Sequence, residues 1–345
     1  MRKLLYTFAA LAGMLAVAAS CQREAPGGTS QDGDLIDVSM SFTVDDGRPA
    51  TKTMIGDGTT ASNLSFYAYD EHNNYLSALS SSATINYNAA THSGSVSFKV
   101  VKGMQYQFVF LATAPDIDYF SLSEDKKTLT VDYNKINTAQ NEKSDFFYYK
   151  SGVVTFTASG ESKPATLKRP LAQLNVGSLA ADMEVASKSG IKTDALETGY
   201  VLTSIPSTLN LLDGTVGDEI AEITLAPDTS PSGNLSVSGS SATYAWVSTA
   251  YVLVDPSGKN TDVTLNVNMT NNSGQALTSI SRSITAVPLK RNYRTNILGN
   301  IFSIDGVLNV SVDSDFEDTD GDENPDDINV DYVSVSNVEN LNTEL

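Results

Sequence analysis

Apolar and polar residues alternate along most of this chain, which is the pattern of a strand with one buried face. The clearest run covers residues 35–44, where the residues on one face are Ile36, Val38, Met40, Phe42 and Val44. Similar runs recur at 64–69, 95–101, 105–111, 153–157, 171–176, 244–254, 263–269, 280–289, 293–301 and 307–312, separated by Gly, Asn and Pro. Only residues 178–189 look helical. The pattern predicts an all-β fold of the Greek-key β-sandwich kind.

The length of 345 residues exceeds the roughly 100–200 residues of one domain, so two domains are expected. A polar, loop-like segment at 159–162 precedes Lys163-Pro164, and a basic and then apolar run follows. This change predicts a boundary near residue 162, with an N-terminal sandwich at 35–162 and a C-terminal sandwich at 163–316. Residues 317–345 then form an acidic linker and a terminal strand.

The start of the chain has the pattern of a bacterial lipoprotein signal. Arg2 and Lys3 precede an apolar run, and small residues lead to Cys21, the single cysteine of the chain. Ala-Ala-Ser-Cys resembles a lipobox, in which cleavage precedes the cysteine and the thiol carries acyl chains such as palmitate. We therefore expect a signal peptide at 1–20, lipidation of Cys21, a flexible tether at 21–34 and anchoring to the outer membrane. The alternative is an ordinary signal peptide with an incidental cysteine.

Charge and residue chemistry narrow the function classes. The formal net charge of −19 disfavours nucleic acid as a partner. The two histidines, His72 and His92, lie in polar turn sequences and are expected at the surface. No nucleophile motif, phosphate loop or dinucleotide fingerprint occurs, so we expect neither an enzyme nor an organic cofactor.

The acidic segment near the C-terminus has the spacing of a calcium loop. Asp318, Asp320 and Asp322 stand two residues apart around Gly321, as at the start of loops that bind calcium through carboxylates. Asn329 occupies the position where a bidentate glutamate would complete such a loop. The sequence therefore predicts either a structural calcium site or a solvated acidic linker.

The segment after this linker reads "INVDYVSVSNVENL" and has strand-like alternation. A strand beyond an acidic linker can add to the open sheet of another subunit, or it can fold back onto its own domain. The sequence leaves both alternatives open.

One aromatic run and the single tryptophan are candidates for ligand contact. Phe146, Phe147, Tyr148 and Tyr149 follow one another and predict an adhesive loop. Trp246 lies within an alternating strand, so we expect it to pack in a core. Tyr67 and Tyr69 are further tyrosines that a glycan could contact.

Several strings together resemble the fimbrillin-type lipoproteins of Bacteroidales, the type V pilins and their accessory subunits. After the lipobox come "VSMSFTV" and "TKTM", then "LKRPLAQLNV" in mid-chain, and "VPLKRNYRTNILGN" at 287–300. The last string also predicts a hairpin, with a basic turn between strands that end at Leu289 and begin at Tyr293. The resemblance covers about residues 35–316.

The resemblance implies two transthyretin-like sandwiches and a specific assembly mechanism. In polymerising members a trypsin-like protease cuts after a basic residue and removes the first strand, and a strand from the next subunit fills the groove. The matching first strand here is 36–44, and the candidate cleavage sites are Arg48 and Lys52. Pro49 follows Arg48 and disfavours cleavage there, whereas Lys52-Thr53 suits a lysine-specific protease. An uncut chain would remain a lipid-anchored accessory subunit or a surface lipoprotein that never polymerises.

The resulting hypothesis is a cell-surface fimbrial subunit, or a fimbria-associated lipoprotein, that acts by β-strand exchange and adhesion. Its expected partners are other pilus subunits, the outer membrane through the lipid anchor, and a host protein or glycan. The alternative is a monomeric outer-membrane lipoprotein that binds glycans.

Overall fold

The computed structural model describes residues 35–44, 58–136, 138–235, 237, 240–303, 308–313 and 333–335. Most of them lie in β-strands, so the all-β prediction is confirmed. The described helices are α1 (Ser77–Ser82), α2 (Ala180–Lys188) and the short 3-10 helix η1 (Glu142–Ser144). The helix predicted at 178–189 corresponds to α2. No helix among these residues is long and apolar enough to span a membrane.

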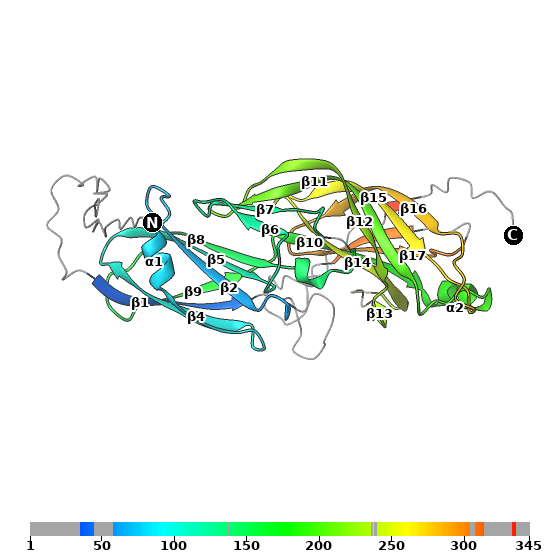
Figure 1. Ribbon diagram of the computed structural model, residues 1–345, viewed down its shortest axis with the longest axis horizontal. Helices are drawn as coiled ribbons and strands as arrows, with labels where there is room; N and C mark the ends of the chain where they lie inside the picture. Colours follow the sequence, from blue (N-terminus) through cyan, green and yellow to red (C-terminus); the bar gives the residue numbers. More distant parts are fainter. Residues whose placement is uncertain are drawn as a thin grey trace, which may run out of the picture. The chain divides into compact units, whose positions relative to one another are not determined.

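Two sheets, built from β1–β5, β8 and β9, pack face to face and form what we call the N-terminal sandwich (Figure 1). Alternating apolar residues of both sheets, such as Phe98 in one and Phe66 and Phe108 in the other, fill the space between them. One sheet has the order β3-β4-β1-β9, with β1 (Leu35–Val44), β3 (Thr84–Asn88), β4 (Ser93–Val101) and β9 (Ser162–Leu167). The other has the order β2-β5-β8, with β2 (Asn63–Asp70), β5 (Gln105–Thr113) and β8 (Phe147–Thr155).

Two larger sheets form what we call the C-terminal sandwich, with a second apolar core between them. One has the order β13-β14-β10-β17-β18-β19, with β10 (Leu171–Leu179), β13 (Asn234–Leu235), β14 (Tyr244–Leu253), β17 (Arg294–Gly299), β18 (Leu308–Asp313) and β19 (Val333–Val335). The other has the order β16-β15-β11-β7-β6 with β12 also on β11, comprising β6 (Phe120–Leu122), β7 (Thr128–Val131), β11 (Glu197–Asn210), β12 (Val216–Thr229), β15 (Lys259–Asn268) and β16 (Ile280–Leu289).

The two sandwiches repeat one topology. In the N-terminal sandwich β1 is antiparallel to β4 and parallel to β9, and in the C-terminal sandwich β10 is antiparallel to β14 and parallel to β17. The order β3-β4-β1-β9 matches β13-β14-β10-β17, and β2-β5-β8 matches β11-β15-β16. Strand β10 is therefore the structural counterpart of β1, although the sequence shows no repeat at a fixed period.

Sheet membership crosses residue 162 in both directions. Strand β9, which begins at Ser162, pairs with β1 in the N-terminal sandwich. Strands β6 and β7 come earlier in the chain but pair in the sheet of β11. The chain then passes from β9 to β10 through Lys168, Arg169 and Pro170. The domain limits expected from the sequence remain a prediction.

The hairpin predicted around residue 290 is wrong, because the turn there carries the chain from one sheet to the other. Strand β16 pairs with β15, whereas β17 pairs with β10 and β18. Asn292 has a left-handed φ of 61° in this turn, and its backbone N–H donates to the carbonyl of Leu171. The side chain of Arg291 donates to the carbonyls of Val254 and Gly214. The basic string thus fixes a crossing between layers.

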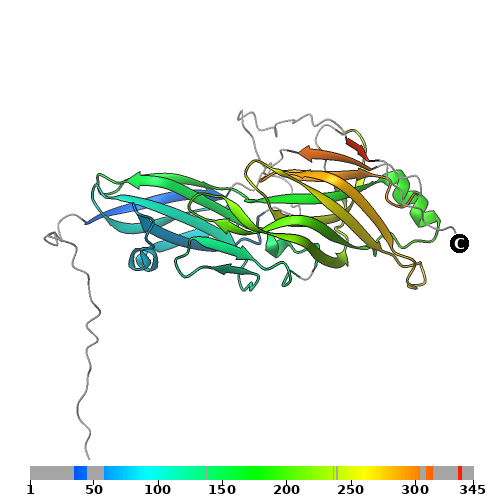
Figure 2. The ribbon, with the colours of Figure 1, turned by 90° about the horizontal axis from the view of Figure 1, so that it is seen from above.

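The short C-terminal strand folds back onto its own sandwich. Strand β19 pairs antiparallel with β18, with Leu308 opposite Val335 (Figure 2). Of the two alternatives left open by the sequence, residues 333–335 take this one in the isolated chain. The rest of the predicted terminal strand lies outside the described residues.

Candidate functional site

Strand β1 occupies an interior position in its sheet, and we call the space between β4 and β9 that it fills the β1 slot (Figure 1). Nine residues, Leu35 to Thr43, are in register with β4, and six, Ser39 to Val44, with β9. The β8–β9 turn adds two backbone bonds, since Gly160 N–H donates to Asp37 and Ser39 N–H donates to Glu161. The strand is therefore hydrogen-bonded along both edges.

The inward face of β1 fills the middle of the N-terminal sandwich. Val38, Met40, Phe42 and Val44 are each at most 6% exposed, as the alternation in the sequence predicts. Burying one such side chain contributes about 1.5–3 kcal/mol. The slot is thus a row of apolar pockets, and a strand that occupies it needs an apolar residue at every second position.

The Phe42 pocket exists because its partner in β4 has no side chain. Phe42 is in register with Gly94, and a Cβ atom on Gly94 would lie 2.6 Å from Cζ of Phe42. The ring packs between Tyr87 and Phe110, with centroids 5.5 and 5.7 Å away. This pocket accepts one large ring at one register position, so it fixes the alignment of the occupant.

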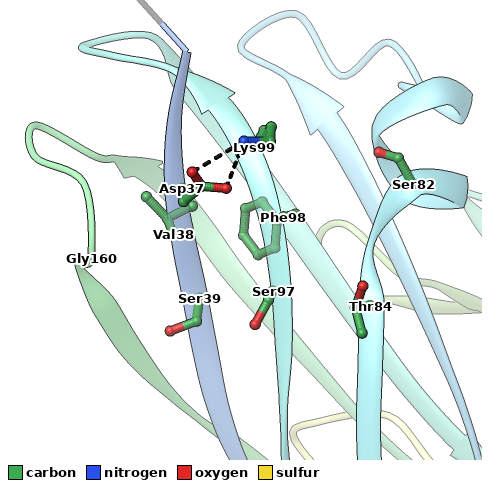
Figure 3. Close-up of a pocket in the computed structure, with 9 residues that line it drawn as sticks. All are labelled: Asp37, Val38, Ser39, Ser82, Thr84, Ser97, Phe98, Lys99 and Gly160. Atoms are coloured by element: carbon green, nitrogen blue, oxygen red, sulfur yellow. Dashed lines mark hydrogen bonds and ion pairs between the residues drawn. The ribbon is translucent and has the colours of Figure 1, made fainter.

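The outward face of β1 lines an open cleft of about 460 Å³ (Figure 3). Most of the residues that line the cleft are polar, among them Ser39 and Ser97 on neighbouring strands and Thr84 on β3. Nζ of Lys99 lies 2.8 Å from one carboxylate oxygen of Asp37 and 3.0 Å from the other. Both side chains are mostly exposed, so this ion pair contributes at most about 1 kcal/mol.

The covalent connections of β1 distinguish it from the other strands. Cys21 is the single cysteine, so no disulfide joins β1 to the sandwich. After Val44 the chain reaches the next described residue, Gly58, through a segment that contains Arg48 and Lys52. One peptide cut in that segment would leave β1 attached to the sandwich by non-covalent contacts alone. Arg48 and Lys52 themselves lie outside the described residues, and their processing stays a prediction.

Two edge strands of the N-terminal sandwich, β3 and β9, carry features that oppose pairing with another chain. Strand β3 is five residues long. Strand β9 has Pro164, which lacks a backbone N–H, and Lys163, whose ammonium lies 5.3 Å from the ring centroid of Phe156. Short edges, proline and lysine are the usual means of preventing edge-to-edge association.

The long edge strand β12 of the C-terminal sandwich is protected by charge. It exposes Asp218, Glu219 and Glu222 along its length, and Pro227 stands near its end. Glu219 forms an ion pair with Lys259 of β15. Pairing of a second copy with β9 or with β12 is therefore unfavourable.

A buried ion pair lies where β9 leads into β10. Nε of Arg169 donates to both carboxylate oxygens of Asp145 at 2.9 Å, and both side chains are at most 1% exposed. The guanidinium also lies 4.4 Å from the ring centroid of Phe147. Burial raises the pKa of Asp145 to about 6, although Arg169 opposes this rise. The pair fixes the linker at the end of the sheet that contains the β1 slot.

The aromatic run predicted to form an adhesive loop lies largely in the cores. Phe146 and Phe147 have no exposed surface, Tyr148 is 9% exposed and Tyr149 is half-buried. Phe146 and Tyr148 belong to the apolar cluster of the C-terminal sandwich, and Phe147 and Tyr149 pack in that of the N-terminal sandwich. Exposed rings are needed for adhesion, so this run does not provide the expected loop.

The remaining predicted residues have mixed outcomes. Trp246 packs in a small cluster with Leu235 and Leu298, as expected. His72 is exposed, but His92 is 6% exposed, so its surface prediction is wrong. Cys21, Asp318, Asp320 and Asp322 lie outside the described residues, and lipidation and calcium binding stay predictions. Among the described residues, no group of three or more His, Cys, Asp or Glu side chains is placed to hold a metal ion.

Sequence reasoning missed the residues that shape the slot. Nothing in the local sequence distinguishes Gly94 from other glycines, because its role depends on the β1–β4 register. Pro164 looked like a boundary residue, whereas it lies on an edge strand. Arg169 lies in "LKRPLAQLNV" and forms the buried ion pair. Its partner, Asp145, is 24 residues earlier in the sequence, and no local pattern connects the two.

A protein-family model described as a family of unknown function (DUF6562) matches residues 32–336. No significant match is found among curated proteins.

Several solved structures show a distant likeness. A candidate cell adhesion protein from Bacteroides uniformis has 14% identity and a TM-score of 0.43, over 82% of this chain and 98% of that one. A fimbrial assembly protein from Parabacteroides distasonis has 12% identity and a TM-score of 0.39, over 80% and 95%. A candidate adhesin from Bacteroides ovatus has 11% identity and a TM-score of 0.42, over 88% and 97%. At these TM-scores the likeness carries no argument about function.

Proposed function

The chain belongs to DUF6562, a family of unknown function, and we propose that it is a cell-surface adhesion or fimbrial subunit that joins its neighbours by exchange of strand β1. The observation that carries this proposal is the β1 slot. Strand β1 is paired on both edges, yet one cut between Val44 and Gly58 would detach it covalently from everything that follows. A detachable interior strand is what an exchange mechanism requires.

The protected edges support replacement rather than simple addition of a strand. A neighbouring chain that approached β9 would meet Lys163 and Pro164, and one that approached β12 would meet a row of carboxylates. The β1 slot, once vacated, would instead offer two unpaired edges and four apolar pockets. An incoming strand would therefore gain ladder bonds on both sides and bury its apolar face.

The shape of the β1 slot also determines which side chains an incoming strand must have. Apolar residues are needed at alternate positions to replace Val38, Met40, Phe42 and Val44, with a flat ring opposite Gly94. The C-terminal segment of a second copy is our candidate donor. It alternates apolar residues, and its described residues, 333–335, already pair as a strand at the edge of a sheet.

Lipidation of Cys21 would place the chain on the outer membrane, with residues 22–34 as a tether. This location suits a subunit whose action is adhesion rather than catalysis. A chain that keeps β1 would remain an anchored accessory subunit, and a chain that loses β1 would enter a polymer.

The test is assembly after a controlled cut. The purified full chain is cut with a lysine-specific protease, the β1 peptide is released in denaturant, and the remaining chain is returned to native buffer and separated on a denaturing gel without boiling. We expect a ladder of multimers in the treated sample, none in the untreated sample, and none with Lys52→Gln. Release of β1 that leaves the remaining chain monomeric would refute strand exchange.

A further inference from the structure

A second concave site lies on the opposite sheet of the N-terminal sandwich, away from the β1 slot. It is a crevice of about 160 Å³ between the outward faces of β2 and β5 and the β6–β7 hairpin. Its lining residues include the buried Leu111 and Leu129, and more of its exposed lining surface is polar than apolar. The crevice is smaller than the roughly 300–1,000 Å³ pockets that enclose drug-sized ligands, so it suits a single ring at the end or side of a longer molecule.

Two half-buried aromatic side chains from different sheets line this crevice. Tyr67 of β2 packs edge-on against Tyr75, with centroids 6.2 Å apart. Phe120 of β6 packs edge-on against Tyr119 and Phe146, with centroids 4.9 and 4.8 Å apart. These contacts hold both rings in place before any ligand arrives, which limits the entropy lost on binding.

Three other lining residues have hydrogen-bonding side chains. Asn63 and Thr113 lie opposite each other in the β2–β5 ladder, and Asp116 follows in the next turn. Their side chains bond no other described residue, so their amide, hydroxyl and carboxylate are available to a ligand. The hydroxyl of Tyr67 is paired with the side chain of Ser65, and burial raises the pKa of this tyrosine, so it stays neutral.

We propose that this crevice binds a neutral saccharide unit of a glycan. A pyranose ring presents apolar C–H faces and a rim of hydroxyl groups, which matches a crevice that has two aromatic rings among several hydrogen-bonding groups. No lysine or arginine lines the crevice, and Asp116 would repel a sulfated, phosphorylated or carboxylated sugar. An entirely apolar ligand would leave the hydrogen-bonding groups of the crevice without partners.

This inference deepens the adhesive part of the proposed function and rests on it for the surface location alone. The crevice and the β1 slot are formed by different strands, and saccharide binding needs no cleavage. The two ideas therefore fail independently.

The test is binding of the purified full chain to an array of neutral and acidic oligosaccharides. We expect binding to a set of neutral glycans, weakened about tenfold or more by Tyr67→Leu or Phe120→Leu, which keep apolar volume but remove the ring. Asp116→Asn, an exposed and nearly isosteric change, should weaken binding to neutral sugars and leave the unfolding midpoint unchanged. Tyr149→Leu, a half-buried tyrosine outside the crevice, is the control and should leave binding unchanged.

Three outcomes would overturn the proposal. These are no binding to any neutral glycan, a preference for acidic glycans, or equal loss of binding with Tyr149→Leu. Multimer ladders measured on the Tyr67, Phe120 and Asp116 variants show whether strand exchange stands independently, because these three residues line the crevice and not the β1 slot.

Discussion

Phe42 of β1 lies directly opposite Gly94 of β4, and a Cβ atom on Gly94 would come within 2.6 Å of the Phe42 ring. The same Cβ would lie 2.1 Å from the carbonyl oxygen of Asn86, so β3 would have to move as well. The Phe42 pocket therefore requires glycine, which has no Cβ atom, on β4 and a large ring on β1.

Gly94→Ala should lower the free energy of unfolding by about 1–3 kcal/mol or more, because neither the ring nor the neighbouring backbone has room. Phe42→Ala should cost about 3–5 kcal/mol by leaving a cavity. Chemical denaturation measures both. Ser97→Ala, on the outward face of the same strand, is the matched control and should change stability by less than about 0.5 kcal/mol. A Gly94→Ala chain as stable as the wild type would contradict the described register.

Lysine-specific proteolysis should cut after Lys52 and leave β1 in place. The four buried side chains and two ladders retain the peptide under native conditions. Native mass spectrometry should therefore show the two fragments together, and denaturant should separate them. The Lys52→Gln chain should not be cut between Val44 and Gly58 by the same protease, since Arg48 is not a substrate of this enzyme. Immediate loss of the cut peptide in native buffer would mean that the slot holds β1 only weakly.

The Asp145–Arg169 pair predicts an unusual pH dependence. The folded-state pKa of Asp145 is raised to about 6, above its usual value of 3.8, because the carboxyl is buried. The folded chain therefore binds this proton more tightly than the unfolded chain does. Its contribution to stability is fully present below pH 3.8 and is lost as the pH rises through about 6.

The comparison of the wild type with Asp145→Asn isolates that contribution. The stability difference between the two chains should change between about pH 4 and pH 6 and stay constant above that range. Urea denaturation at a series of pH values measures it. A difference that is flat across this range would show that Asp145 titrates at its ordinary value.

Removing the protective residues of β9 should promote self-association. In the Lys163→Val, Pro164→Val double variant, the strand regains a backbone N–H and loses its charge, so a second chain can pair with it. Sedimentation velocity should show dimers or larger species, whereas the wild type stays monomeric. Thr166→Val adds a β-branched apolar residue to the same strand without altering its donors, and this control should stay monomeric too. Equal association of both variants would point to surface hydrophobicity rather than to the open edge.

Sequence alternation predicted the strands that have one apolar face, and β1 is the clearest case. It missed β11, the longest strand together with β12 in the described part of the chain, because its pattern is interrupted. A register shift lies between Thr198 and Tyr200, and Ser204 has a left-handed φ of 55°. Each irregularity moves the following side chains to the other face, so a period of two is lost.

The candidate sites were less accessible to sequence reasoning than the strands. The importance of Gly94 depends on a pairing between segments about fifty residues apart, and the crevice brings together Tyr67 and Phe120 from different sheets. Local patterns contain no information on such pairings. Tyr67 was one of several tyrosines considered for glycan contact, and only its position relative to Phe120 sets it apart.

The repeated topology has a consequence for the architecture of any polymer. Strand β10, the counterpart of β1, is buried along almost its whole length and is continuous with described chain at both ends, so it cannot be exchanged. Each molecule would then have one slot that can accept a strand, the β1 slot, although its two sandwiches share one topology. A subunit that accepts only one strand from a neighbour can only extend an unbranched filament.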